Sequence, residues 1–169
     1  QKLILRGGTA IKKVYFPEFR YSEDLDFIVK NRDDLRIFVA NCEKILKKIS
    51  GDLPIEIGQR PEFPQKGHLQ LLVHYDIVPE IHLAKELKID IVEDDVVLPS
   101  KKRKILFSFA DFVGSRKFLD VYDLESIAAE KIGRILDVVD EPRDLWDLHY
   151  LLKLGLNFGA VSKLSLIHI

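Results

Sequence analysis

The sequence predicts an α+β fold in which a mixed-sheet core is followed by C-terminal helices. Short apolar runs separated by Gly and Pro fill most of residues 1–122 and are typical of strands. Residues 123–154 instead place their apolar side chains at helical spacing. We therefore expect a core over residues 1–122 and a helical section over residues 123–169 that packs on it in a single compact unit.

Three short elements are predicted at the start of the chain. The apolar run KLIL at residues 2–5 predicts a buried strand that ends at a tight turn formed by Gly7 and Gly8. Residues 9–16, TAIKKVYF, have helical spacing up to a following proline, which indicates a short helix. Residues 24–30, DLDFIVK, alternate in polarity and indicate a strand.

The middle of the chain is predicted to be mostly sheet after one long helix. Residues 31–50 carry an amphipathic stripe with Asn31 or Asp33 as the cap, which indicates a helix. Alternating segments bounded by Pro and Gly predict strands at residues 55–60, 68–77 and 86–93. The basic run at residues 101–104 predicts a turn that leads into a further short strand. Two helices follow, at residues 123–139 and 143–154.

The composition argues against several classes of protein. The 169 residues include 26 basic and 27 acidic side chains, so the net charge of −1 gives no overall signature of a nucleic-acid binder. The run KKRK at residues 101–104 is the densest basic cluster, and such a run is usually a solvated turn. The single cysteine, Cys42, excludes an internal disulfide and a cysteine-based metal site. No apolar run approaches the ~20 residues that span a bilayer, so we expect a soluble, cytoplasmic protein with no membrane partner.

Three aspartates on predicted strands are candidate metal ligands. Asp24 and Asp26 share one face of a strand, where two carboxylates repel each other unless water, a base or a cation relieves them. A divalent cation such as Mg²⁺ prefers oxygen ligands of this kind. Asp90 is the single acid on the face of KIDI that also carries Lys88, and it meets the pair if the two strands are neighbours. An exposed strand edge is the alternative for the pair, and Asp76, near a proline, is predicted to stabilise a turn.

Two features suit a phosphate group. Gly7 and Gly8, between a strand and a helix, let the backbone approach a phosphate, and the Thr9 hydroxyl is placed to donate to it. A purely structural turn is the alternative for the glycines. Lys131 lies near the centre of the apolar arc predicted for residues 123–139. Its ammonium either extends to the rim of that arc or is held in a cleft, where it contacts phosphate.

The last predicted helix, residues 143–154, places an acid among its leucines. Asp144 falls inside the apolar arc and Asp147 on its flank, which gives Asp144 the more functional position. The alternative is that an acid in the first turn stabilises the helix dipole. The five histidines show no metal-binding spacing, and the sequence contains neither a G-x-S-x-G elbow nor a P-loop. These patterns argue against a zinc site and against hydrolase and P-loop functions.

Five segments of the chain form a specific combination: LRGGTAIKKVY, RYSEDLDF, KIDI, LESIAAEKIGRIL and PRDLWDLHYLL. Together they resemble the AbiEii-type nucleotidyltransferase family, the toxin component of abortive-infection toxin–antitoxin systems in phage defence. The resemblance covers nearly the whole chain. It implies a DNA-polymerase-beta-like nucleotidyltransferase core that uses a nucleoside triphosphate with Mg²⁺ or Mn²⁺. Family members extend further at both ends, so the resemblance also implies a truncated core.

The resemblance implies a role for each matching residue. The metal ligands implied are Asp24, Asp26 and Asp90. Nucleotide binding is implied for Gly7, Gly8, Thr9, Ser22, Lys131 and Arg143. The catalytic set adds Lys131, which contacts the nucleotide phosphates, and Asp144, a base or positioning group, to the three metal ligands. Asp147 is a weaker addition to this set.

The resemblance further implies an acceptor and a partner. The acceptor in related toxins is RNA, such as transfer RNA, and the partner is a cognate antitoxin. One alternative is a non-catalytic module that retains the transferase fold and a nucleotide pocket but acts as a regulatory or interaction protein. A remoter alternative is a structural α+β domain whose acids face solvent.

Overall fold

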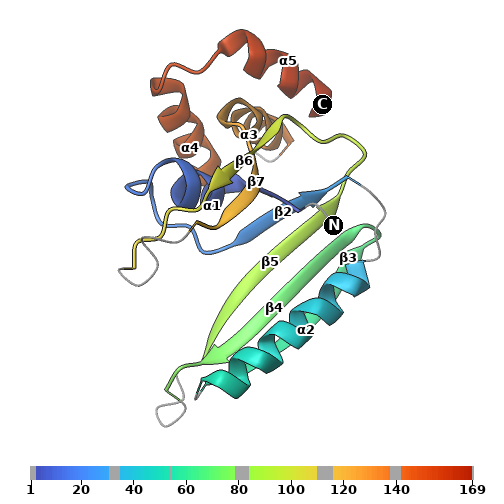
Figure 1. Cartoon of the computed structure of the whole chain (residues 1–169). Helices are drawn as coiled ribbons and strands as arrows, with labels where there is room; N and C mark the ends of the chain where they lie inside the picture. The colour runs from blue at the N-terminus through green and yellow to red at the C-terminus, as the bar shows by residue number, and fades with distance from the viewer. Residues whose placement is uncertain are drawn as a thin grey trace. The chain divides into compact units, whose positions relative to one another are not determined.

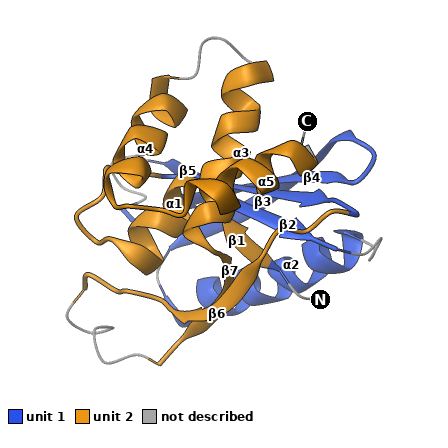
Figure 2. Cartoon of the chain, turned by 90° about the horizontal axis from the view of Figure 1, so that it is seen from above, with its two compact units in different colours: residues 1–3, 23–95 blue, residues 4–22, 96–169 orange. Residues whose placement is uncertain are grey.

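The chain consists of two compact units in the computed structural model (Figures 1 and 2). Unit 1 comprises Gln1–Leu3 and Glu23–Asp95, and unit 2 comprises Ile4–Ser22 and Val96–Ile169. The structure describes residues 3–30, 35–53, 55–78, 84–109, 116–137 and 142–168. None of the helices within these ranges is long and apolar enough to cross a membrane.

Unit 1 is a layer of four strands with one long helix. Its elements are β2 (Leu25–Val29), α2 (Leu35–Asp52), β3 (Glu56–Gln65), β4 (His68–Asp76) and β5 (Lys85–Glu93). The strands lie in the order β3-β4-β5-β2, in which β3–β4 and β4–β5 are antiparallel and β5–β2 is parallel. Because side chains alternate along a strand, this layer has two faces of different character.

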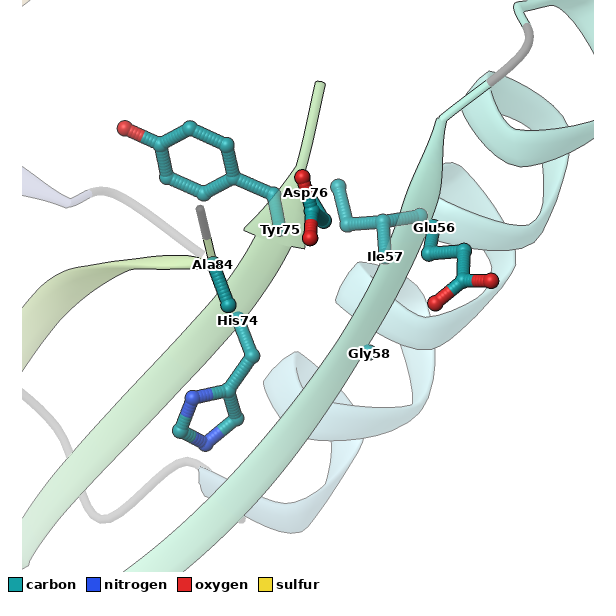
Figure 3. A pocket seen from close by; sticks show the side chains of 7 residues that line it. All are labelled: Glu56, Ile57, Gly58, His74, Tyr75, Asp76 and Ala84. Carbon is teal, nitrogen blue, oxygen red and sulfur yellow. The ribbon is translucent and has the colours of Figure 1, made fainter. Parts of the chain in front are cut away.

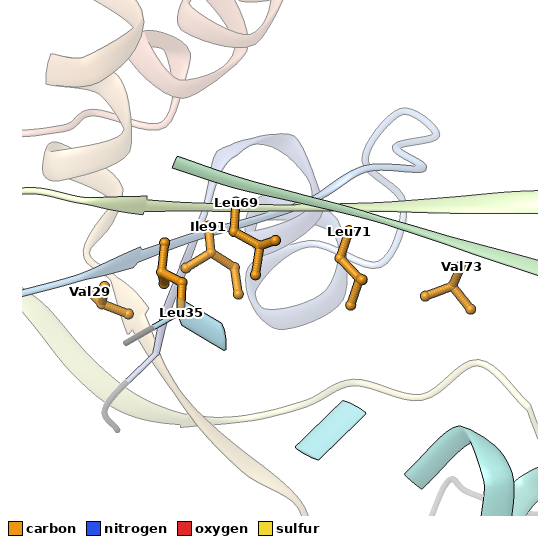
Figure 4. Close-up of a cluster of buried hydrophobic side chains, with 6 residues drawn as sticks. All are labelled: Val29, Leu35, Leu69, Leu71, Val73 and Ile91. Atoms are coloured by element: carbon orange, nitrogen blue, oxygen red, sulfur yellow. The ribbon is translucent and has the colours of Figure 1, made fainter. Parts of the chain in front are cut away.

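One face of the layer is apolar and is covered by α2 (Figures 1 and 4). Its core is a cluster of six buried side chains, Val29, Leu35, Leu69, Leu71, Val73 and Ile91. Further side chains of α2 pack against this cluster, namely Phe38, Val39, Cys42 and Leu46. Each buried aliphatic side chain contributes roughly 1.5–3 kcal/mol on leaving water. The opposite face carries Asp26, Lys88 and Asp90, so the apolar core fixes which side the acids occupy.

Unit 2 combines three strands with helices. Its elements are β1 (Ile4–Arg6), α1 (Gly7–Ala10), η1 (Ile11–Tyr15), β6 (Ser100–Lys104), β7 (Phe118–Tyr122), α3 (Leu124–Asp137), α4 (Pro142–Lys153) and α5 (Phe158–His168). β1 pairs with β7 in parallel, and β6 pairs with β7 antiparallel. The π turn η1 continues directly from α1. α3 packs against both α4 and α5.

The core of unit 2 forms around β7 and α3. Tyr122, Ile127 and Leu151 are fully buried there. The Tyr15 hydroxyl donates a hydrogen bond to the Tyr122 carbonyl oxygen at 2.6 Å, which ties η1 to the end of β7. An aromatic group then joins the segment after η1 to α4, through ring contacts among Phe16, Phe19, Trp146 and Tyr150. These contacts hold the glycine-rich N-terminal segment against the C-terminal helices of the same unit.

The α+β class is confirmed, with both parallel and antiparallel strand pairs, but the basic run is corrected. Residues 101–104 were expected to form a turn; they lie in the strand β6, and residues 105–108 after them do not form a strand. Backbone pairing with β7 overrides the weak strand preference of lysine, and the lysines of this strand are exposed, so their charges stay in water. The sequence pattern does not predict β7 or α5. The division at residue 122 stays a prediction.

Two boundaries near the N-terminus also differ from expectation. The glycines do not form a turn before the helix: Gly7, with φ of 71°, is the first residue of α1. Asp24 lies one residue before β2 instead of inside it. The long helix predicted over residues 31–50 is present as α2, while its expected cap residues, Asn31 and Asp33, fall outside the described ranges.

Candidate functional site

Two aspartates lie side by side on the polar face of unit 1. Asp26 in β2 is the register partner of Asp90 in β5. Adjacent strands lie about 4.8 Å apart, so side chains that are directly opposed on one face are close neighbours. Both residues are half-buried, whereas Asp24, just ahead of β2, is exposed. The two acid-bearing strands are therefore neighbours, and Asp90 lies directly opposite Asp26.

Asp90 is held by three side chains. Lys88 Nζ lies 2.9 Å from Asp90 Oδ2, and Gln70 Nε2 donates to Oδ1 at 3.2 Å. His68 Nε2 lies 3.1 Å from the same Oδ1 and donates to it in the tautomer that carries its proton on Nε2. Burial raises the pKa of the Asp90 carboxyl, but the hydrogen bonds outweigh burial and hold the pKa below its usual range. Asp90 is thus an anion of fixed orientation.

The Lys88 ammonium lies in the field of Asp24, Asp26 and Asp90. Its pKa is raised chiefly by the hydrogen bond to Asp90, while burial opposes that rise. The negative charges of Asp90, Asp24 and Asp26 raise the pKa of Lys88 further. A positive charge therefore already stands among these carboxylates.

The donor chemistry of this face suits a divalent cation. Mg²⁺ is usually held by one or two carboxylates, with substrate phosphates and waters completing its ligands. Within the described ranges, no group of three or more His, Cys, Asp or Glu side chains is arranged to hold a metal ion. Asp26 and Asp90 fit a Mg²⁺ site in which phosphate oxygens supply the remaining ligands. The Lys88 ammonium occupies the position of a positive charge beside Asp90.

In unit 2, the glycine segment is packed against Ser22. Thr9 is buried, and its hydroxyl donates to Ser22 Oγ at 2.8 Å. A Cβ atom added at Gly8 would lie 3.0 Å from Ser22 Oγ and 3.2 Å from Arg20 Nη2. A larger residue at position 8 would therefore force the Ser22 and Arg20 side chains to shift, which is a structural reason that favours glycine there besides phosphate binding.

A buried network of charges links α3, α4 and the segment before Ser22. Arg20 binds both carboxylate oxygens of Asp147, with Nε at 2.5 Å from Oδ1 and Nη2 at 2.6 Å from Oδ2. Lys131 Nζ lies 2.6 Å from Asp144 Oδ1 and 2.7 Å from Asp147 Oδ2. Each of the two buried anions thus lies within contact distance of Lys131, and Asp147 is also bound by Arg20. Lys131 is only 5% exposed, so it does not extend to the rim of the helix arc.

The two acids of α4 differ from expectation. Asp147, predicted on the flank of the apolar arc, is fully buried, while Leu145 on the same helix is 60% exposed. The buried face of α4 is Asp144, Asp147 and Leu151, which begins polar because it meets Lys131. Arg134 Nε lies 3.1 Å from Asp144 Oδ2, but its N–H does not point at this oxygen. The buried Oδ2 atom therefore has an ion-pair contact and accepts no hydrogen bond.

Comparison with known proteins decides the family. A sequence profile described as the nucleotidyl transferase AbiEii toxin of type IV toxin–antitoxin systems matches residues 1–166. The chain belongs to the AbiEii family. Members of this family are nucleotidyltransferase toxins, which agrees with the resemblance of the five sequence segments.

The solved structures support the fold of this AbiEii chain. MenT4, a nucleotidyltransferase toxin from Mycobacterium tuberculosis H37Rv, is similar with a TM-score of 0.69 at 21% identity. The similarity covers 97% of this chain and 55% of MenT4, so the chain spans little more than half the length of that protein. No match is found among curated proteins.

The AbiEii motif residues are divided between the two units. Unit 1 contains Asp24, Asp26 and Asp90, and unit 2 contains Gly7, Gly8, Thr9, Ser22, Lys131, Arg143 and Asp144. The structure brings together Asp26 with Asp90, Thr9 with Ser22, and Lys131 with Asp144. Arg143 is exposed, and in the described part of the chain it makes no ion pair. Asp76 takes the turn role predicted for it, because its Oδ1 accepts a hydrogen bond from the Val78 amide at 3.1 Å.

Four residues next to the AbiEii motifs escape sequence reasoning. Lys88, His68 and Gln70 surround Asp90, and Arg20 binds Asp147. Alternation along the strand places Lys88 on the same face as Asp90, so the sequence alone indicates that the two side chains are neighbours. Nothing in the sequence reports that His68 and Gln70 lie across from that strand, because the pairing of β4 with β5 is a tertiary contact.

A hollow at one end of β3 and β4 is distinct from the AbiEii motifs (Figure 3). It has a volume of about 470 Å³ and is lined by residues that include Glu56, His74 and Asp76. None of the AbiEii motif residues lines it. Asp76 there is engaged in its turn, and His74 Nδ1 lies 3.3 Å from Glu86 Oε2. We assign no role in nucleotide binding to this hollow.

Proposed function

We propose that this AbiEii chain carries the core of a Mg²⁺-dependent nucleotidyltransferase that moves a nucleotidyl group from a nucleoside triphosphate to RNA, such as transfer RNA. The pairing of Asp26 with Asp90 on the polar face of unit 1 carries the proposal. Two carboxylates on one strand face are the ligands that Mg²⁺ uses together with substrate phosphates. Because both proposed substrates, a nucleoside triphosphate and RNA, are found inside the cell, we also assign the protein to the cytoplasm.

The acids of unit 1 are assigned to metal binding. Asp26 and Asp90 would hold the cation, and Asp24 is assigned a further contribution through its exposed carboxylate. A bound divalent cation would supply positive charge to the phosphate oxygens during transfer. In that transfer the acceptor hydroxyl oxygen bonds to the α-phosphorus, the bond to the β-phosphate breaks, and pyrophosphate leaves. Gln70 and His68 keep the Asp90 carboxylate aimed through its Oδ1 atom.

The residues of unit 2 are assigned to the nucleotide and the acceptor. Lys131 has three N–H donors, of which two point to Asp144 and Asp147, and the third is assigned to a phosphate oxygen. Asp144 Oδ2, which lacks a hydrogen-bond donor, is assigned to the acceptor hydroxyl. The backbone at Gly7 and Gly8 and the hydroxyls of Thr9 and Ser22 are assigned to the triphosphate, with exposed Arg143 as a further cation.

The charge of β6 supports a polyanionic acceptor. Lys102 and Lys104 alternate along this edge strand, and Arg116 and Lys117 stand just before β7. All four are exposed, and in the described part of the chain none of them makes an ion pair. Exposed cations of this kind suit the phosphate backbone of RNA. The family supports a role as a toxin in abortive infection, with a cognate antitoxin as partner.

Transfer of label from a nucleotide to RNA tests the proposal. The chain is incubated with each α-labelled nucleoside triphosphate, Mg²⁺ and total RNA, and the labelled RNA is resolved on a gel. Asp26→Asn is expected to lower labelling at least about 100-fold, because a metal ligand is lost. Asp52→Asn, the same change at an exposed acid of unit 1, is the matched control and is expected to label like wild type. Nucleotide binding without labelled RNA would instead favour the non-catalytic module.

A further inference from the structure

The polar face of unit 1 already contains a cation. Lys88 lies two residues before Asp90 on β5, so both side chains project from the same face. Its Nζ lies 2.9 Å from Asp90 Oδ2. The Lys88 side chain remains 39% exposed while that of Asp90 is 13% exposed, so the ammonium approaches the carboxylate from the solvent side.

The two oxygens of Asp90 have different partners. Oδ1 is engaged by His68 and Gln70, both on β4, at 3.1 and 3.2 Å. Oδ2 is engaged by Lys88, at 2.9 Å. A divalent cation that binds Asp90 through one oxygen therefore takes Oδ2, since taking Oδ1 would displace two donors instead of one. The cation and the Lys88 ammonium compete for the same atom.

We propose that Lys88 is a tethered counter-ion to the Asp90 carboxylate, beside Asp26, and that a divalent cation must displace it to bind. The proposal rests on the metal site of the proposed function. Lysine suits this role because its compact charge sits on a flexible stem, which lets it leave without a change in the backbone. The protein thereby avoids repulsion between the two acids when no metal is bound, and in return binds the metal less tightly.

Manganese binding tests this competition without any catalytic readout. Mn²⁺ binding to the full chain, free of nucleotide, is measured by titration calorimetry and by the electron paramagnetic resonance signal of free Mn²⁺. Lys88→Gln is expected to bind Mn²⁺ about 10-fold more tightly than wild type, because a competing positive charge is gone. Lys88→Arg, which keeps the charge, is expected to stay near the affinity of wild type.

The chain offers a matched control on the same strand. Lys85 is also in β5 but alternates to the other face, so Lys85→Gln removes an equal charge away from the acids. Its Mn²⁺ affinity is expected to stay within twofold of wild type. Thermal melting provides a second measurement: Mn²⁺ is expected to raise the melting temperature of Lys88→Gln by more than that of wild type.

The outcomes separate this inference from the proposed function. Unchanged or weaker Mn²⁺ binding by folded Lys88→Gln, or an equal gain in Lys85→Gln, overturns the counter-ion role. If wild type labels RNA while Lys88→Gln gains no affinity, the inference alone fails. If Lys88→Gln gains affinity that Asp26→Asn removes, and no RNA is labelled, the counter-ion role stands and the transferase proposal fails.

Discussion

The buried charged side chains described in unit 2, Lys131, Asp144 and Asp147, each contact a side chain of opposite charge. Asp147 is fully buried and receives a two-point hydrogen bond from Arg20 and a contact from Lys131. Replacing such a network with apolar groups can be harmless, but removing one member leaves a charge without its partner. The network is therefore sensitive to the loss of any one charge, whatever its part in nucleotide binding.

Loss of the Asp147 charge is expected to destabilise the protein. Asp147→Asn leaves the Arg20 charge without its carboxylate partner and removes one of the two carboxylates at Lys131, so it should lower the free energy of unfolding by about 3–5 kcal/mol. Urea denaturation followed by circular dichroism measures this change. Asp137→Asn, at an exposed position at the end of α3, should change it by no more than about 0.5 kcal/mol. Similar stabilities for the two variants would show that Asp147 is not needed for folding.

Tyr15 is expected to give the protein a dependence on alkaline pH. Burial raises the pKa of the Tyr15 hydroxyl above its usual value, and the neighbouring Arg103 opposes that rise. The stabilisation from the neutral phenol is therefore complete below pH ~10 and is lost as pH rises through the folded-state pKa. Tyr15→Phe should lower stability by about 1 kcal/mol at pH 8, through loss of the hydrogen bond to Tyr122, and should flatten the decline above pH ~10.

The comparison is made by urea denaturation at pH 8 and at several higher pH values. Tyr21→Phe, at a position that is 74% exposed, serves as the control and should follow wild type across the series. An equally steep alkaline decline in Tyr15→Phe and wild type would assign that decline to other groups.

At the scale of elements, the lysines of β6 can serve two functions: protection of a sheet edge and attraction of RNA. Charged side chains on an edge strand prevent pairing with another chain, and the same charges attract RNA phosphates. Arg103 takes part in neither use, because it lies over the Tyr15 ring at 4.6 Å and pairs with Asp123. Lys102 and Lys104, about 6.8 Å apart along the strand, are the residues that distinguish the two uses.

Removal of these two charges is expected to weaken RNA binding in a salt-dependent manner. In the double variant Lys102→Gln, Lys104→Gln, the slope of log affinity against log salt should fall by about 1.4, since each lost phosphate contact removes about 0.7 for a single strand. Fluorescence anisotropy of a labelled RNA over a salt series measures the slope. The control removes two exposed lysines of α2, Lys44 and Lys48, and should keep the slope of wild type. Aggregation with an unchanged slope would favour edge protection.

At the scale of the whole molecule, the sequence predicts those features that depend on local pattern. Alternation places Asp26 and Asp90 on polar strand faces, and helical periodicity places Lys131 in a buried arc. The partners of these residues follow from tertiary pairing, which a single sequence does not record: Gln70 reaches Asp90 because β4 pairs with β5. The strand β6 is not predicted because four consecutive basic residues are typical of a solvated turn, and their strand conformation depends on pairing with β7.

The parallel pairing of β2 with β5 has a consequence for how the protein is made. Asp26 and Asp90 become neighbours only through a pairing between strands that are separated along the chain by α2, β3 and β4. On a growing chain, residues up to the end of β4 therefore lack half of the carboxylate pair, however well they fold. The chemistry assigned to that pair cannot begin until β5 has been synthesised and has found its register.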